Sequence, residues 1–128
     1  MSEEQRWQEI QSQLDLPREW VTQLGQLLIA MEVLLAHETT NEANSALSSA
    51  KEALELANRL VNWTEGGSFE AFTATAEGLR NALENTAVML ASTESSASAE
   101  DHLRDLSSLH DRVDGFAAWV TALTASQA

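Results

Sequence analysis

The three histidines, His37, His102 and His110, are the side chains best suited to hold a transition metal, because the chain has no cysteine. Helical bundles bind pairs of metal ions with inward carboxylates and two Glu-x-x-His pairs. The residues three positions before the histidines are Leu34, Ala99 and Ser107. None of them is glutamate. His102 and His110 lie eight residues apart, which is about 12 Å along a helix and too far for one ion with nitrogen ligands at about 2 Å. We therefore predict no metal ligand and no cofactor.

The histidines of the last predicted helix have structural interpretations instead. His110 and Asp114 are four residues apart, so they are placed to hydrogen bond on one helix face. His102 extends the apolar stripe of that helix backward by one turn. We expect it to be a partly buried histidine near the start of the helix.

Glu52 and Glu55 form a Glu-x-x-Glu pair. This pair resembles the first half of the magnesium site of the all-helical nucleoside triphosphate pyrophosphohydrolases. The following helix offers Glu70, Glu77 and Glu84, seven residues apart, but no Glu-x-x-Asp. Rows of glutamate opposite an apolar stripe are typical of a solvent-facing helix surface. A metal-dependent nucleotide pyrophosphohydrolase is therefore the last of three functional alternatives.

Other catalytic motifs are missing from the sequence. It has no glycine-rich phosphate loop, no nucleophile elbow and no His-Glu-x-x-His pair. We therefore predict a protein that is not an enzyme and has no catalytic residues.

The charge balance restricts the partners. The chain has 20 acidic and seven basic residues, a net charge of −13. Binding to nucleic acid needs clustered lysine and arginine, whereas Lys51 and six arginines are scattered here, so we expect no direct binding. An acidic protein can instead mimic nucleic acid and inhibit a basic partner, which is the second alternative. The acidic surface can also be an adaptation to a saline cytoplasm that involves no partner.

Four tryptophans and no tyrosine are an uneven choice of aromatic residues. Tryptophan anchors binding surfaces as readily as it fills a core. Trp20 lies within an apolar stripe, so we expect it in the core. Trp7, Trp63 and Trp119 are the predicted partner-binding residues, because they lie near the chain ends, at a helix end or beside a stripe rather than within one.

Apolar residues recur every three or four positions along the whole chain, and this spacing predicts helices throughout. The expected helices span about 3–14, 17–37, 40–62, 69–91 and 99–124. Capping pairs support three of the starts: Ser2 with Gln5, Thr39 with Glu42, and Ser98 with Asp101. The sequence therefore predicts an all-α fold, an antiparallel up-down four-helix bundle with a short additional N-terminal helix, as a single helical domain over residues 1–128.

The connections between these helices also have sequence signals. Pro17 predicts the break after the first helix. Gly66 and Gly67, after Trp63, suit a helix C-terminus with a left-handed glycine. The serine-rich run 92–98 has neither period nor bulk, which predicts a mobile loop.

Location and function follow from the general profile. The first residues lack the pattern of a secretory signal, and the longest apolar stretch, 27–36, is too short for a membrane span, so we expect a cytoplasmic protein that does not contact membranes. The small, acidic, helical profile resembles the cytoplasmic export chaperones of flagellar and type III secretion systems, as a class and without a shared residue motif. We predict a non-enzymatic protein–protein interaction module, adaptor or chaperone-like, whose partner is another protein or a second copy of itself.

Overall fold

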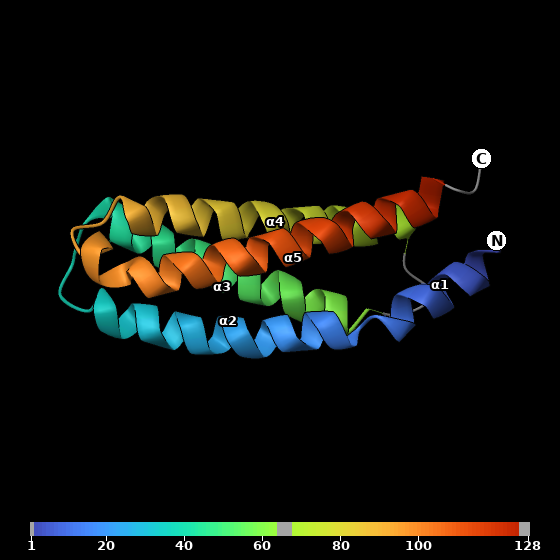
Figure 1. Ribbon diagram of the computed structural model, residues 1–128, viewed down its shortest axis with the longest axis horizontal. Helices are drawn as coiled ribbons and strands as arrows, with labels where there is room; N and C mark the ends of the chain where they lie inside the picture. The colour runs from blue at the N-terminus through green and yellow to red at the C-terminus, as the bar shows by residue number, and fades with distance from the viewer. Residues whose placement is uncertain (1, 64–67, 126–128) are drawn as a thin grey trace.

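A computed structural model describes residues 2–63 and 68–125. Within these residues the chain forms five α-helices, one 3-10 helix and no strand, which confirms the prediction of an all-α fold. The helices are α1 (Glu3–Ser12), α2 (Asp15–Leu34), α3 (Asn41–Val61), α4 (Phe69–Ala91) and α5 (Glu100–Ala125), with the 3-10 helix η1 (Ser96–Ala99) before α5 (Figure 1). None of the described helices combines the length and the apolarity that crossing a membrane requires.

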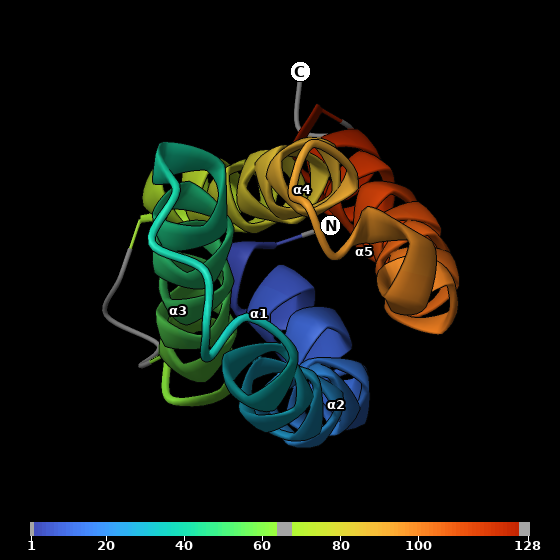
Figure 2. The ribbon, with the colours of Figure 1, turned by 90° about the vertical axis from the view of Figure 1, so that its left-hand side faces the viewer.

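The long helices α2 to α5 lie side by side, and each runs opposite to the one before it (Figure 1). Viewed end-on, they follow one another in chain order around the molecule (Figure 2). α3 packs along α2, α4 along α3 and α5 along α4, whereas α5 and α2 approach each other at only a few residues. The short helix α1 lies at the end of the molecule that holds both chain termini (Figure 1). The chain therefore closes tightly on three sides and stays open on the fourth.

Two of the predicted helix starts can be compared with the observed caps. The hydroxyl of Ser2 accepts from the backbone N–H of Gln5, whose side chain accepts from the N–H of Ser2, so the predicted capping box is present. For α3 the prediction of Thr39 as the cap is wrong by one residue. Thr40 is the cap, because its extended backbone lets the hydroxyl accept from the N–H of Ala43 at 3.2 Å.

The boundary between α1 and α2 differs from the sequence expectation. α1 ends at Ser12, two residues before the expected Leu14, and Gln13 donates its N–H to the Ile10 carbonyl in a tighter turn. α2 begins at Asp15 rather than at Pro17. Proline is tolerated there because the first turn of a helix has no intrahelical acceptor for its N–H groups. The helices are therefore nearly continuous, and proline lies inside the first turn of α2.

The run 92–98, predicted to be a loop, contains the start of η1, and α5 follows directly without the predicted Ser98 cap. The carboxylate of Glu38 fixes this connection. It accepts from the backbone N–H of Glu94 at 3.0 Å and from the hydroxyl of Ser95. Glu38 lies in the connection between α2 and α3, so this carboxylate joins two loops at the same end of the molecule.

The connection between α3 and α4 is only partly described. The predicted glycine C-terminus at Gly66 and Gly67 lies outside the described residues. Before it, α3 ends at Val61, and Asn62 donates its N–H to the Asn58 carbonyl at 3.0 Å. After it, the hydroxyl of Ser68 caps α4 by accepting from the N–H of Ala71.

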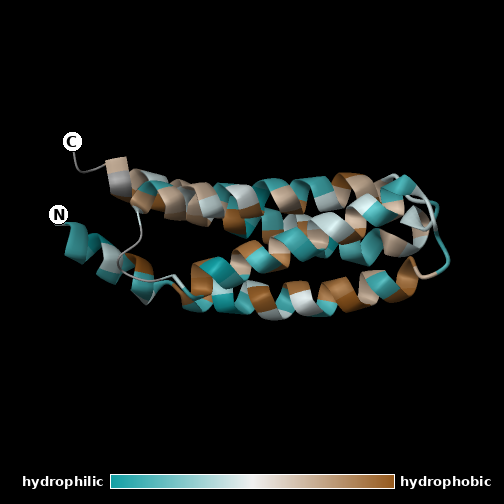
Figure 3. Cartoon of the chain, turned by 180° about the vertical axis from the view of Figure 1, so that it is seen from behind, coloured by the Kyte–Doolittle hydropathy of each residue, from teal (hydrophilic) through white to brown (hydrophobic). Residues whose placement is uncertain are grey.

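Small residues bring α3 and α4 together along what we call the α3–α4 seam. Its buried alanines include Ala46 and Ala53 on α3 and Ala76 and Ala82 on α4. Ala53 has no exposed surface. Side chains that end at the β-carbon allow two helices to approach closely. Figure 3 shows hydrophobic patches among hydrophilic ones on the long helices, while α1 is mostly hydrophilic.

Candidate partner-binding groove

A hollow with a volume of about 360 Å³ lies between α2 and α5. It is lined from α2 by Gln23, Gln26, Leu27 and Ala30, and from α5 by His102, Asp105, Ser108, Leu109 and Arg112. A second hollow of about 330 Å³ is lined by Gln13, Leu16, Arg112, Gly115, Phe116 and Trp119. Arg112 lines both, so the two hollows adjoin. We call the combined surface the α2/α5 groove.

The floor of this groove is apolar and its sides are polar. Leu27, Leu109 and Phe116 line it while being almost entirely buried in the core. Gln23 and Gln26 line it from α2 and are exposed. Burying an amide or a charged group without a hydrogen-bonding partner costs free energy, so these side chains keep α2 and α5 apart.

The groove has the length of a short helix. On α2 it extends from Leu16 to Ala30, and on α5 from His102 to Trp119. At 1.5 Å per residue these stretches are about 21 Å and about 26 Å long. A helix of about four turns fits along this length.

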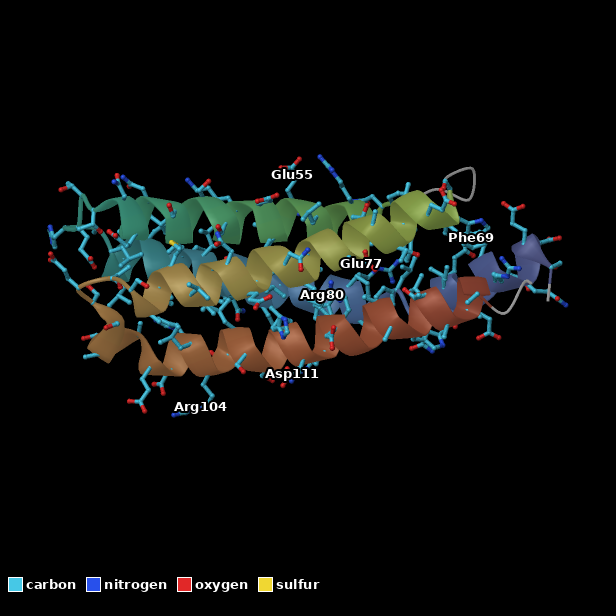
Figure 4. The ribbon with its side chains drawn as sticks, turned by 90° about the horizontal axis from the view of Figure 1, so that it is seen from above. Glu55, Phe69, Glu77, Arg80, Arg104 and Asp111 are labelled. Carbon is cyan, nitrogen blue, oxygen red and sulfur yellow. The ribbon has the colours of Figure 1, made fainter. Side chains whose placement is uncertain are left out.

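Arg112 is the cation at the middle of the groove. In residues 2–63 and 68–125 no carboxylate forms an ion pair with it. Asp114, two residues on, is instead held by Arg80 of α4, whose guanidinium donates to it at 3.3 Å. Figure 4 shows Arg80 on α4 beside α5. Arg112 therefore presents its charge to whatever occupies the groove.

The predicted hydrogen bond between His110 and Asp114 is wrong. Asp114 accepts from Arg80, and the nearest carboxylate to the His110 ring is that of Asp111, with Nδ1 at 3.5 Å from Oδ1. The guanidinium from the neighbouring helix is always charged and makes a charge-assisted hydrogen bond to this carboxylate. His102 is half-buried at the start of α5, as its position in the stripe predicts, and it lines the groove.

Trp119 is the predicted partner-binding residue that lies in the groove. It is half-buried, lines the second hollow and contacts Phe116, with ring centroids 5.8 Å apart. Phe116 in turn packs edge-on against Trp20 at 5.3 Å, and Trp20 is buried, as expected of a core residue. One face of Trp119 is therefore supported by the core.

The other two predicted residues lie together at the α1 end. Trp7 is 5% exposed and stacks on Phe69 with centroids 4.4 Å apart. Trp63 is half-buried, and both it and Trp7 pack edge-on against Phe72. Phe72 also contacts Phe116 at 6.2 Å, which links this aromatic cluster to the groove. Trp7 and Trp63 line neither hollow, so their role in binding stays a prediction.

Arg6 lies in the same cluster and is fully buried. Its guanidinium carbon is 5.3 Å from the centroid of the Phe69 ring, which Figure 4 labels at this end. Its three side-chain nitrogens have no hydrogen-bond acceptor among the described residues. The contact between a cation and an aromatic face is favourable, but it offsets only part of the free energy lost when the guanidinium leaves water. The α1 end is therefore closed by packing in which the Arg6 guanidinium has no acceptor within residues 2–63 and 68–125.

The acidic residues considered for a magnesium site do not gather. Glu52 is exposed, and Glu55 is paired with Arg59 on its own helix at 2.9 Å. Glu77 lies on α4, and Figure 4 shows it on the helix beside that of Glu55. Throughout the described part of the chain, no three carboxylates or histidines lie close enough to hold one cation.

Sequence reasoning missed most of the groove, although α5 carries a signal for it. A second stripe runs beside the core stripe in steps of three, four, three and four residues: Asp105, Ser108, Arg112, Gly115 and Trp119. A regular stripe of mixed polar and aromatic residues indicates a helix face that is neither core nor fully solvated. No comparable signal distinguishes Gln23 and Gln26 on α2 from ordinary surface residues.

Comparison with known proteins gives no match among protein-family models, curated proteins or solved structures. The groove is therefore the feature that indicates a function.

Proposed function

We propose that this protein is a non-enzymatic, cytoplasmic protein–protein interaction module, adaptor or chaperone-like, that holds a helix of another protein in the α2/α5 groove. In this proposal the chain is an antiparallel up-down four-helix bundle with a short additional N-terminal helix, and the partner lies where α2 and α5 approach each other at only a few residues. The observation that carries it is the pair of hollows that adjoin at Arg112 above an apolar floor.

The groove has the features that recognition of an amphipathic helix requires. Such a helix places its apolar face on an apolar strip, with polar side chains along both edges. Leu27, Leu109 and Phe116 supply the strip, and Gln23 and Gln26 supply one polar edge. Trp119 is the aromatic anchor, because a large, partly supported ring at a hollow contributes most when a partner covers it.

The net charge of −13 favours another protein over a second copy. Two copies repel each other, whereas a partner with basic residues is attracted from a distance. The rival proposal, a nucleic-acid mimic, predicts a different salt response. Binding through surface carboxylates weakens steeply as salt rises, whereas contact with an apolar floor is largely insensitive to salt.

A photo-crosslinking experiment tests the location of the partner. A benzoylphenylalanine replaces exposed Ser108, which lines the groove, or exposed Asn81 on α4 as the matched control. We expect crosslinks to one partner from position 108 and none from position 81. Equal crosslinking from both positions contradicts the proposal.

Two glycine variants then test the groove with the identified partner. A β-carbon built on Gly115 or on Gly25 meets no atom within 4 Å, so both positions accept a larger side chain, but only Gly115 lines the groove. We expect Gly115→Leu to weaken binding at least about tenfold by filling the second hollow, and Gly25→Leu to leave the Kd unchanged. Circular dichroism confirms that both variants keep their helix content. An unchanged Kd for Gly115→Leu overturns the proposal.

A further inference from the structure

We infer that Arg112 selects the partner's helix by pairing with a carboxylate in the middle of that helix. The inference rests on the proposed function and names the partner's chemistry: an amphipathic helix of about four turns that carries one central Asp or Glu and a basic residue seven positions from it.

Arg112 has a unique position in the described part of the chain, because it alone lines both hollows. Leu109 lies on one side of it along α5 and Phe116 on the other. The neighbouring Gly115 leaves open space where other residues would place a β-carbon. A helix that lies along the groove therefore passes the guanidinium near its own midpoint.

The guanidinium determines which residue fits at that midpoint. It offers five N–H donors in a planar fork and cannot accept a hydrogen bond, so it matches the two oxygens of a carboxylate. Among the described residues no acidic side chain already occupies it. An apolar floor beneath the pair excludes water on one side and strengthens the interaction. A lysine at the same place is repelled.

Asp105 fixes a second contact. It lines the first hollow seven residues before Arg112, which is about 10.5 Å along the axis of α5. Two residues seven apart on a partner helix have the same spacing on the same face. A lysine or arginine seven positions from the central carboxylate is therefore placed to pair with Asp105. These two pairs of opposite sign set both the register and the direction of the bound helix.

The probes are three synthetic 18-residue amphipathic helices with a leucine stripe and a lysine seven positions from the centre. They differ only at the central position, which is Glu, Gln or Lys. Fluorescence polarisation at physiological salt gives the Kd of each for the full chain. We expect the Glu peptide to bind about tenfold more tightly than the Lys peptide, with the Gln peptide between them.

Charge reversal provides the decisive control. Arg112→Glu should reverse the order of the peptides, so that the Lys peptide binds most tightly. Arg104→Glu makes the same change of charge on the same helix, but Arg104 is exposed, lines neither hollow and lies on the outer side of α5 (Figure 4). We expect it to keep the original order. If Arg104→Glu changes the order as much as Arg112→Glu does, general electrostatics replaces the inference.

The outcomes separate the inference from the proposed function. In one outcome Gly115→Leu weakens binding, but the three peptides bind equally well. This result overturns the role of Arg112 and leaves the groove as the binding surface. Binding that is insensitive to Gly115→Leu, or no binding of any peptide, overturns both. Self-association that Gly115→Leu abolishes assigns the groove to a second copy of the chain and also overturns both.

Discussion

The α3–α4 seam and the α2/α5 groove are each formed by two helices of one chain, yet they differ in which residues line them. In the seam both helices bury alanines, such as Ala53 on α3 and Ala82 on α4, and Asn85 donates a hydrogen bond across it to Ser49. In the groove, Gln26 and Arg112 occupy the facing positions. Small side chains permit close contact, whereas long polar ones forbid it unless another molecule satisfies them.

This difference indicates that the seam and the groove have different roles. The seam supplies a rigid scaffold whose packing is complete without a ligand. The groove stays open above its apolar floor, since closing it would bury the amides and the guanidinium without partners. Binding sites in helical folds lie between helices in this way, on a scaffold that is stable before the ligand arrives. The following predictions test whether the two regions differ as described.

The same substitution should lower the stability far more in the seam than in the groove. Ala53→Leu adds volume to the closed seam, and we expect the free energy of unfolding to fall by about 2–3 kcal/mol. Ala30→Leu adds the same volume to the groove, where Ala30 lines a hollow of about 360 Å³, and we expect a change below about 0.5 kcal/mol. Urea unfolding followed by circular dichroism measures both. Equal losses contradict the distinction.

Arginine-to-methionine exchange compares a buried guanidinium with an open one. Arg6 is buried over Phe69 without an acceptor among the described residues, so Arg6→Met should raise the free energy of unfolding by about 1–2 kcal/mol. Arg112→Met removes an exposed cation and should leave stability within about 0.5 kcal/mol. A loss of stability in Arg6→Met indicates that its charge is compensated.

Glycine positions with open surroundings give a smaller effect. Gly115 and Gly25 lie inside helices, where glycine is less favourable than alanine by about 0.5–1 kcal/mol. Since a β-carbon at either position meets nothing within 4 Å, Gly115→Ala and Gly25→Ala should each stabilise the fold by about that amount. Thermal unfolding measures the gain. A loss at Gly115 shows that α2 approaches α5 more closely than the groove requires.

The outer face of α2 should contribute least. Ile29 and Val33 are 65% and 74% exposed, and neither lines the groove. We expect Ile29→Ser and Val33→Ser to change stability by less than about 0.5 kcal/mol and to leave the Kd of the Glu peptide within about twofold. Loss of peptide binding in either variant moves the binding surface from the groove to this face.

Local sequence signals predicted much of the fold. The helix 69–91 is observed with the same bounds, because Ser68 caps its start and the apolar period continues to its end. The capping box of Ser2 and Gln5 is likewise a matter of residues three apart. Helix caps and helix bounds depend only on neighbours in the chain, so they can be predicted from the sequence.

The groove and the buried arginine could not be predicted in the same way. The sequence places Arg6 on a polar helix, where a surface position is expected. It is buried because Phe69 and Trp7 meet at the α1 end. The separation of α2 from α5 depends on side chains about 80 residues apart, such as Gln26 and Ser108, which line the same hollow. The period of the apolar residues identifies the faces of each helix, but it does not show which faces lack a neighbouring helix.

An NMR titration of the labelled protein with the Glu peptide tests the central claim most directly, because the four tryptophan side-chain N–H signals report on both the groove and the α1 end. We predict that the Trp119 signal moves furthest, that backbone signals in 16–30 and 102–119 move with it, and that the Trp7 and Trp63 signals and the α3–α4 seam stay in place. The largest shifts at Trp7 or Trp63, or along α3 and α4, would show that the partner binds elsewhere.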